Sequence, residues 1–278
     1  MDQQQSRKLM EAYEAALRRE EKSEVTVEKY LRDARTFLDW ADERPLTKEL
    51  VQAYKRRLIE HGYATRSVNA ILAGVNSCLR FLSRDDCRVR GLRSQQKVYC
   101  SEARELTREE YLRLLGAAKN RPRLHLLLQT IGRTGIRISE LRFFTVEAAR
   151  RGEVEVSAKG KRRVVLLPAR LKKKLLDYAR RYGIQNGALF RTRSGRPLDR
   201  SNIWTEMKSL CTAAKVAPGK VFPHNLRKLF ARSFYALEKD IAKLADVLGH
   251  SSVNTTRIYI MTSGNEHRRL LERMHLVT

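Results

Sequence analysis

Apolar residues recur at intervals of three and four through the first hundred residues, which is the spacing that one face of an α-helix requires. Two stretches show it behind an expected cap at Thr26 and between Thr47 and Gly62. The widest stripe follows Thr65, and its members are Val68, Ile71, Leu72, Val75, Cys78, Leu79 and Leu82. Because a stripe this wide is a core face, the sequence predicts a helical bundle at the N-terminal end.

The charge of the chain points to a polyanionic partner. Lysine and arginine total 57 against 31 acidic residues, a formal net charge of +26. Such a field attracts nucleic acid, although a ribosomal or membrane-surface protein could share it. Hydrophobic residues make up 42% of the chain, which is enough for ordinary cores and excludes a disordered polycation.

Targeting and metal signals are missing from the sequence. Residues 1–21 lack the apolar stretch of a signal peptide, and no apolar run of about 18 residues predicts a membrane span. None of the cysteines has zinc-finger spacing, so we expect free thiols and no metal; they are Cys78, Cys87, Cys100 and Cys211. We therefore expect a cytoplasmic protein without membrane partners.

Helical periodicity fades after residue 85, and basic residues gather there: Arg88, Arg90, Arg93 and Lys97. We interpret residues 88–104 as an inter-domain linker near DNA, with a solvated basic loop as the alternative. A capping box formed by Thr107 and Glu110 then predicts a new helix start. The sequence thus predicts a helical domain over residues 1–87, the basic linker, and a second domain over residues 105–278.

The second domain combines helices with a small β-hairpin. Residues 153–156 and 164–167 alternate like strands, with residues 157–163 as the expected turn and Pro168 as the end of the second strand. The turn carries Lys159 and Lys161, which a hairpin tip could place in a DNA groove. The fold class expected is mainly α with a small β-sheet.

Four short motifs carry the chemistry. They are TGIRISEL at residues 134–141, HNLR at 224–227, LGH at 248–250 and TTRIY at 255–259. Two histidines, two arginines and a tyrosine form a metal-free set for attack on a phosphodiester. An arginine fork suits two phosphate oxygens, whereas the ordinary pKa of a tyrosine hydroxyl near 10 means that attack needs cations or a base nearby.

Local structure supports these motifs one by one. Pro223 predicts a helix start that places His224 and Arg227 on one face, where the helix dipole favours an anion. We expect Leu226, Phe230, Phe234 and Leu237 to be the buried stripe of this helix. Gly135 is expected to turn the chain into a helix that carries Arg137, and Gly249 to cap the helix that precedes His250. Each motif alone would be weak.

Together and in this order, the motifs resemble the tyrosine recombinase (phage-integrase-type) family, in particular two-domain Xer-type recombinases and small mobile-element integrases. The resemblance implies a core-binding N-terminal domain and a catalytic domain. It makes Tyr259 the nucleophile, Arg137 and Arg227 the phosphate clamp, and His224 and His250 the assisting groups. It makes Lys159 the general acid, with Lys161 as a rival. Lys228 departs from the pattern, which often has histidine there, and is expected to face DNA.

The implied function is site-specific DNA recombination through a 3′-phosphotyrosine intermediate, without metal, ATP or another cofactor. The alternatives are a type IB topoisomerase, which shares these residue types, and a DNA-binding protein that no longer cuts. The family expectation is double-stranded DNA with paired half-sites, a homo-tetramer in the synaptic complex and a monomer or dimer off DNA. The resemblance also implies that the protein works on the nucleoid. The C-terminal tail with Leu270, Leu271 and Met274 would pack on its own domain or on a neighbouring protomer.

Overall fold

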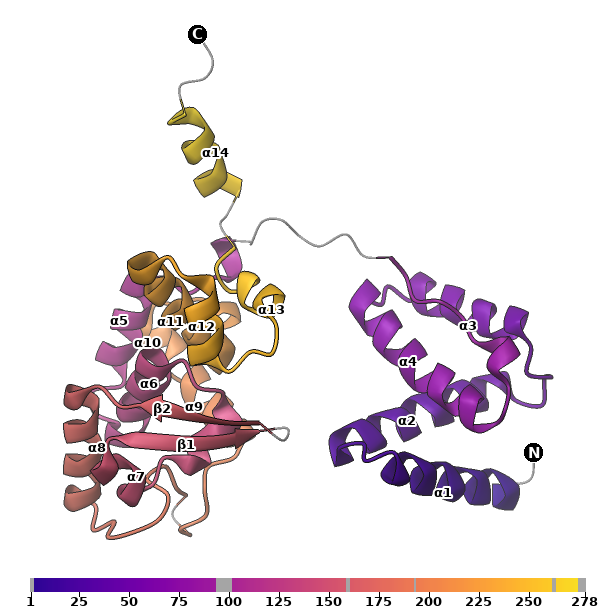
Figure 1. Cartoon of the computed structure of the whole chain (residues 1–278), viewed down its shortest axis with the longest axis horizontal. Helices are drawn as coiled ribbons and strands as arrows, with labels where there is room; N and C mark the ends of the chain where they lie inside the picture. The colour runs from indigo at the N-terminus through magenta and orange to yellow at the C-terminus, as the bar shows by residue number, and fades with distance from the viewer. Residues whose placement is uncertain (1–2, 94–101, 159–160, 193, 262–263, 275–278) are drawn as a thin grey trace. The chain divides into compact units, whose positions relative to one another are not determined.

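The computed structural model describes residues 3–93, 102–158, 161–192, 194–261 and 264–274. The chain divides into two compact units, Met1–Gln96 and Lys97–Thr278 (Figure 1). Within the described ranges the only sheet is a two-stranded hairpin, and the remaining elements are helical. The expected fold class, mainly α with a small sheet, is confirmed. None of the described helices is long and apolar enough to cross a membrane.

The first unit is a bundle of helices. In the described residues these are α1 (Gln3–Arg19), α2 (Glu24–Ala41), α3 (Lys48–Glu60) and α4 (Thr65–Phe81), followed by the 3-10 turn η1 (Asp85–Cys87). Helix α4 packs against α2 and α3 through the stripe that its sequence predicts, in which Val68, Leu72 and Val75 are at most 1% exposed. The expected helix start at Thr47 is confirmed, because its side chain accepts a hydrogen bond from the Leu50 amide at 3.2 Å.

Two details of this bundle differ from expectation. Helix α2 begins at Glu24, because the Ser23 carbonyl already accepts hydrogen bonds from the Thr26 and Val27 amides; the expected cap at Thr26 was wrong. Helix α1 had no specific prediction, although Met10, Tyr13 and Leu17 follow helical spacing and are buried. The many charged residues on the exposed side of α1 make the segment polar overall, so the apolar stripe was not recognised.

The basic segment after η1 is not a free loop at its start. Val89 is 7% exposed, and the Asn76 side chain bonds both the amide and the carbonyl of this residue, at 3.1 and 2.8 Å. Asn69 does the same for Leu92, at 2.7 and 2.9 Å. The part of the expected linker from residue 88 to residue 92 therefore lies against α4, because two asparagine side chains satisfy its backbone.

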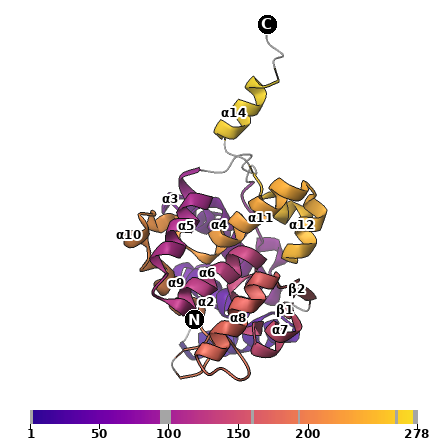
Figure 2. The same ribbon diagram turned by 90° about the vertical axis from the view of Figure 1, so that its left-hand side faces the viewer.

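The second unit is built around α6 (Pro122–Thr134), which packs against α8 (Ala169–Arg181) and α11 (Pro223–Glu238) (Figures 1 and 2). Its other described helices are α5 (Arg108–Ala117), α7 (Val146–Arg151), α9 (Arg200–Lys208), α10 (Cys211–Ala214), α12 (Ile241–Leu248), α13 (Val253–Arg257) and α14 (Gly264–Glu272), with 3-10 turns η2 (Glu102–Arg104), η3 (Ile138–Phe143) and η4 (Pro218–Lys220). The capping box of Thr107 and Glu110 is confirmed. One continuous apolar core joins α5 through α11.

The hairpin is longer than the sequence suggested. Strands β1 (Glu153–Ala158) and β2 (Lys161–Leu166) pair antiparallel up to Ala158 opposite Lys161, so the expected turn over residues 157–163 was too long. Alternation explains the difference: Val165 is buried, whereas Arg162 is exposed and Val164 is 53% exposed. Polar residues on the solvent face continue a strand that has only one buried face.

The last helices carry three of the motifs. Helix α11 begins at Pro223 as expected, and Gly249 ends α12 in the left-handed conformation at φ 65°. Two expectations were wrong. Leu237 is 87% exposed, because the buried stripe of α11 ends a turn earlier. Gly135 ends α6 at φ 61° instead of beginning a helix.

Candidate active site

Arg227 lies at the centre of the candidate site, in the first turns of α11, and is 2% exposed. Its guanidinium donates to the carbonyl oxygen of Gly135, to the carbonyl oxygen of Leu248 at 2.7 Å and to Nε2 of His250 at 2.9 Å. Burial, followed by the nearby Arg137 cation, lowers the pKa of Arg227 to about 10. The group is still a cation at neutral pH, and it ties α6, α11 and α12 together.

Arg137 caps the 3-10 turn η3 and turns toward the same place. Its amide donates to Glu140 Oε2 at 2.8 Å and its Nη1 to Glu140 Oε1 at 3.0 Å. Its Nη2 donates to the carbonyl oxygen of Gly249 at 3.2 Å. The side chain is 38% exposed while Glu140 is 1% exposed, so a buried carboxylate holds an arginine whose side chain remains partly exposed.

A third arginine joins this cluster and was missed in the sequence. Arg163 of β2 donates from Nη2 to Glu140 Oε2 at 2.7 Å and from Nη1 to the Val247 carbonyl oxygen at 2.9 Å. Burial lowers its pKa even though Glu140 acts in the opposite direction. Extending the strand alternation by two residues would have found it, because Arg163 falls on the same face as the buried Val165.

His250 follows the Gly249 cap and has both ring nitrogens occupied. Arginine can only donate, so Nε2 accepts from Arg227, and Nδ1 carries the proton that is shared with Thr256 Oγ1 at 2.8 Å. Burial, together with the cations of Arg227, Arg137 and Arg163, lowers the pKa of His250 to about 4. The ring is neutral at physiological pH.

Tyr259 lies between the two histidines and is 9% exposed. Its ring centroid is 5.0 Å from that of His224 and 5.0 Å from that of His250, and the Arg227 guanidinium carbon is 5.8 Å from it. The ring packs in a small apolar cluster with Ala231, Leu244 and Leu248. Partial desolvation, followed by the cations of Lys228 and Arg227, lowers the pKa of His224 as well, although this residue is exposed.

The structure brings Arg137, His224, Arg227, His250 and Tyr259 together from segments more than a hundred residues apart. Lys159 lies outside the described residues, and so does the side chain of Lys161, whose backbone belongs to β2. In the described residues no group of acidic, histidine or cysteine side chains could hold a metal ion.

The other basic residues expected at DNA have different surroundings. Lys228 donates to Glu105 at 2.8 Å and its side chain is 20% exposed, so it pairs with its own chain where a free cation was expected. Arg88 pairs with Asp85 at 2.6 Å, while Arg90 and Arg93 are exposed in the first unit. Lys97 is outside the described residues.

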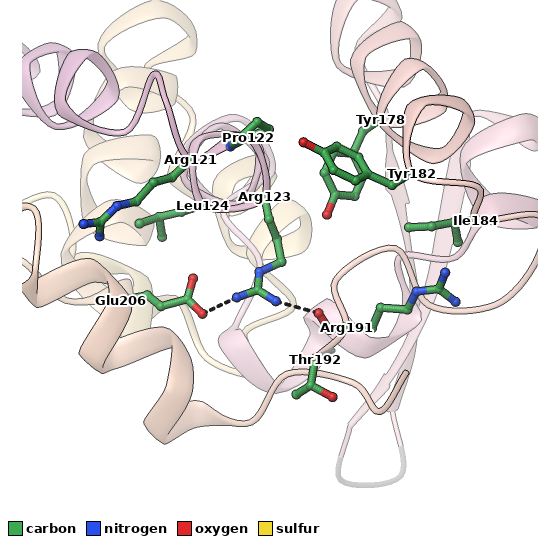
Figure 3. Close-up of a pocket in the computed structure, with 10 residues that line it drawn as sticks. All are labelled: Arg121, Pro122, Arg123, Leu124, Tyr178, Tyr182, Ile184, Arg191, Thr192 and Glu206. Atoms are coloured by element: carbon green, nitrogen blue, oxygen red, sulfur yellow. Dashed lines mark hydrogen bonds and ion pairs between the residues drawn. The ribbon is translucent and has the colours of Figure 1, made fainter. Parts of the chain in front are cut away.

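A cavity of about 710 Å³ in the second unit is distinct from this cluster (Figure 3). Arg123 at its centre donates to Glu206 and to the Arg191 carbonyl oxygen, and the rings of Tyr178 and Tyr182 close one side. No residue of the arginine–tyrosine cluster lines it. The candidate active site is therefore the cluster around Arg227.

A tyrosine that lies between two histidines beside a cluster of arginines, on a helical domain with one hairpin, is the arrangement of the tyrosine recombinase class. Residues 104–266 match the family described as "Phage integrase family", and residues 10–86 match "Phage integrase, N-terminal SAM-like domain". The chain belongs to the phage integrase family. It is a tyrosine site-specific recombinase, similar to Xer recombinases, which cleaves and rejoins DNA.

Similar proteins cover nearly the whole chain. Tyrosine recombinase XerA of Thermococcus kodakarensis is 30% identical over 277 residues, covering 97% of this chain and 96% of that protein. Tyrosine recombinase XerD of Haemophilus influenzae is 27% identical over 274 residues, covering 91% and 92%. A lambda integrase tetramer bound to a Holliday junction shares the fold at a TM-score of 0.73 and 20% identity, covering 91% of this chain and 76% of that one.

Proposed function

We propose that Tyr259 attacks the scissile phosphate of double-stranded DNA, forming a 3′-phosphotyrosine link and releasing a 5′ hydroxyl that later reverses the reaction. The observation that carries this proposal is the position of the Tyr259 ring, 5.0 Å from two neutral histidines and 5.8 Å from the Arg227 guanidinium. Buried cations stabilise both a forming phenolate and the charge that builds on phosphorus oxygens.

Arg137 and Arg227 would form the phosphate clamp. In this structure their N–H groups donate to the carbonyl oxygens of Gly135, Leu248 and Gly249, weaker partners than an anionic phosphate. The Nε of Arg227 is buried and has no partner in the described part of the chain. A buried donor of this kind is costly when unpaired, and a phosphate oxygen would satisfy it.

The histidines and a hairpin lysine would take part in proton transfer and hydrogen bonding to the phosphate. The lowered pKa of His224 favours its neutral form, and its ring packs against Tyr259, so it is available to accept the proton of the tyrosine hydroxyl. His250 would bond a nonbridging phosphate oxygen. Lys159, with Lys161 as its rival, would protonate the departing 5′ oxygen, because Lys161 begins β2 and Lys159 precedes it by two residues in the sequence.

The helical first unit and the exposed cations Arg90 and Arg93 would contribute to DNA binding. Residues 1–87 would be the DNA-binding domain, residues 88–104 the linker and residues 105–278 the catalytic domain. The substrate would be paired half-sites, each bound by one protomer, and the synaptic complex a homo-tetramer assembled on the nucleoid. Lambda integrase structures on DNA contain a tetramer or a dimer. Leu271 and Met274 are 54% and 55% exposed, which supports docking of the tail on a neighbouring protomer.

The test is covalent trapping on a nicked suicide substrate that carries the attachment sequence from the flanking genome. Wild type should form a denaturation-resistant DNA adduct and Tyr259→Phe none, whereas Tyr235→Phe, a tyrosine packed beside the same cluster, should react like wild type. An adduct from Tyr259→Phe refutes the nucleophile, and no adduct from any of the three despite binding refutes autonomous cleavage. Relaxation of a plasmid that lacks the site would favour the topoisomerase alternative.

A further inference from the structure

Arg163 anchors the hairpin at the point where the strands leave the body of the second unit. Its two bonds reach Glu140 in η3 and the Val247 carbonyl oxygen in α12, at 2.7 and 2.9 Å, and the side chain is 14% exposed. The stem of Arg163 passes so close to Gly249 that an added Cβ there would lie 2.4 Å from the arginine Cδ. One side chain of the hairpin therefore contacts both the turn that carries Arg137 and the turn that carries His250.

Toward the tip this anchoring stops. Arg163 pairs with the buried Val156 across the hairpin, while the next residues on each strand, Arg162 and Ser157, are exposed. Among the described side chains of β2, Arg163 is thus the one nearest the tip that bonds to the rest of the unit. Lys161 and Lys159 precede this anchor by two and four residues in the sequence. The end of β2 that begins at Lys161 is therefore tied to Glu140 and Val247 through Arg163.

We propose that Arg163 is a positioning residue for protonation of the leaving group. It holds the lysine-bearing hairpin to the frame of Glu140 and Val247, so that the hairpin lysine meets the departing oxygen; this inference rests on the function proposed above. In the cleavage step the Tyr259 oxygen bonds to phosphorus as the P–O5′ bond breaks. The 5′ oxygen takes a proton from the lysine ammonium, and the tyrosine hydroxyl proton passes to neutral His224.

The guanidinium contacts of the phosphate clamp are not made to Arg163. The Nη1 of Arg137 bonds Oε1 of Glu140, whereas Arg163 bonds Oε2, an acceptor that it shares only with the Arg137 backbone amide. Arg227 bonds Gly135, Leu248 and His250, none of them through the hairpin. Removing the Arg163 guanidinium should therefore weaken leaving-group protonation while the attack geometry around Tyr259 persists.

A substrate that needs no general acid separates these effects. In a suicide substrate with sulfur in place of the bridging 5′ oxygen, the leaving group is a thiolate, whose conjugate acid has a pKa of about 8.5 like that of a cysteine thiol and which departs without a proton. Adduct formation is measured in single turnover on the oxygen and the sulfur substrate for wild type, Arg163→Met and Arg163→Lys. Lys159→Ala and Lys161→Ala supply the reference pattern for a lost general acid.

Arg163→Met should form the adduct about 10- to 100-fold more slowly than wild type on the oxygen substrate, the range expected for a misplacement near 1 Å. On the sulfur substrate it should react within about 3-fold of wild type, as a protonation defect of this size is bypassed. Arg163→Lys keeps the charge but loses the fork, and should show the same pattern at smaller amplitude. Arg162→Met, an equal charge change on the exposed face, should change both substrates by the same factor.

Equal losses of Arg163→Met on the two substrates would overturn the proposal, because they would place Arg163 in the clamp or in folding alone. No loss on either substrate would overturn it as well. Thermal melting and DNA binding are measured for each variant, and Arg163→Lys decides the outcome if Arg163→Met does not fold. Failure of the wild type on both substrates would count against the proposed function, which keeps the two claims separate.

Discussion

Arg227 donates from Nη2 to Nε2 of His250 across 2.9 Å, and this bond occupies the ring nitrogen that would meet a substrate phosphate. For His250 to donate from Nε2, Arg227 must turn to the phosphate and the ring must change tautomer. Thr256 makes that change feasible, because its hydroxyl, 2.8 Å from Nδ1, can accept in one tautomer and donate in the other. The Arg227–His250 hydrogen bond and the proposed phosphate contacts of these two residues therefore exclude each other, because both use the same atoms.

Thr256→Val should impair both stability and cleavage, although valine has nearly the same size as threonine. Thr256 is fully buried, and valine keeps its shape but leaves Nδ1 of His250 without a partner. A buried unpaired polar group costs about 1–3 kcal/mol, so the free energy of unfolding should fall by that amount in urea titrations. Single-turnover cleavage should fall more than about 10-fold, since one donor to the transition state is lost. Thr256→Ser, which keeps the hydroxyl, should retain most of the cleavage; equal loss in both variants would contradict the role of the hydroxyl.

The stability of the second unit should decrease in mild acid through His250. Its pKa of about 4 in the folded protein lies below its ordinary value, so the unfolded chain binds the proton first. Stability from the neutral ring is therefore complete above about pH 6.5 and is lost as the pH falls toward 4. The loss should be on the order of 2 kcal/mol after allowing for solvent screening. Urea unfolding at pH 7.5 and 5.0 should show a smaller difference for His250→Gln than for wild type; identical differences would rule out His250 as the source.

Glu140→Gln should destabilise the protein and slow cleavage. The carboxylate is 1% exposed and accepts from Arg137 and Arg163, so its loss leaves two clustered cations without their counter-charge. Removing one partner of a buried ion pair costs about 3–5 kcal/mol, which thermal or urea unfolding can measure. Glu155→Gln makes the same change on an exposed position of β1 and should alter stability by less than about 0.5 kcal/mol. Comparable effects of the two substitutions would contradict the special role of Glu140.

Alanine substitutions at two glycines with similar backbone conformation distinguish the cost of backbone strain from the cost of a steric clash. Gly249 and Gly183 have φ of 65° and 62°, but a Cβ at Gly183 meets nothing within 4 Å while one at Gly249 meets Arg163 at 2.4 Å. Gly183→Ala should cost about 1–2 kcal/mol from the left-handed conformation alone. Gly249→Ala should cost more, and it should also slow adduct formation, because Arg163 and His250 lie on either side of it. Unchanged cleavage by a folded Gly249→Ala protein would show that this contact does not matter.

Local patterns account for the parts of the prediction that were right. The caps at Thr47, Thr107 and Gly249 and the start of α11 at Pro223 depend on backbone chemistry within one turn, so they can be read without knowing the fold. The wrong predictions concern residues whose burial depends on segments that are distant in the chain. Leu237 continues a helical stripe in sequence but is 87% exposed. The ion pair of Lys228 with Glu105, more than a hundred residues away in the chain, is likewise set by packing that local patterns do not show.

Periodicity, capping and residue identity are enough to predict most helices of the first unit, the hairpin and the order of the motifs that contain Arg137, Arg227, His250 and Tyr259. Only the tertiary structure decided that Glu140 is a buried carboxylate shared by Arg137 and Arg163, and that Arg227 bonds His250. Those contacts join segments distant in the chain, and their energies come from burial and hydrogen-bond geometry, which exist only after the segments have packed.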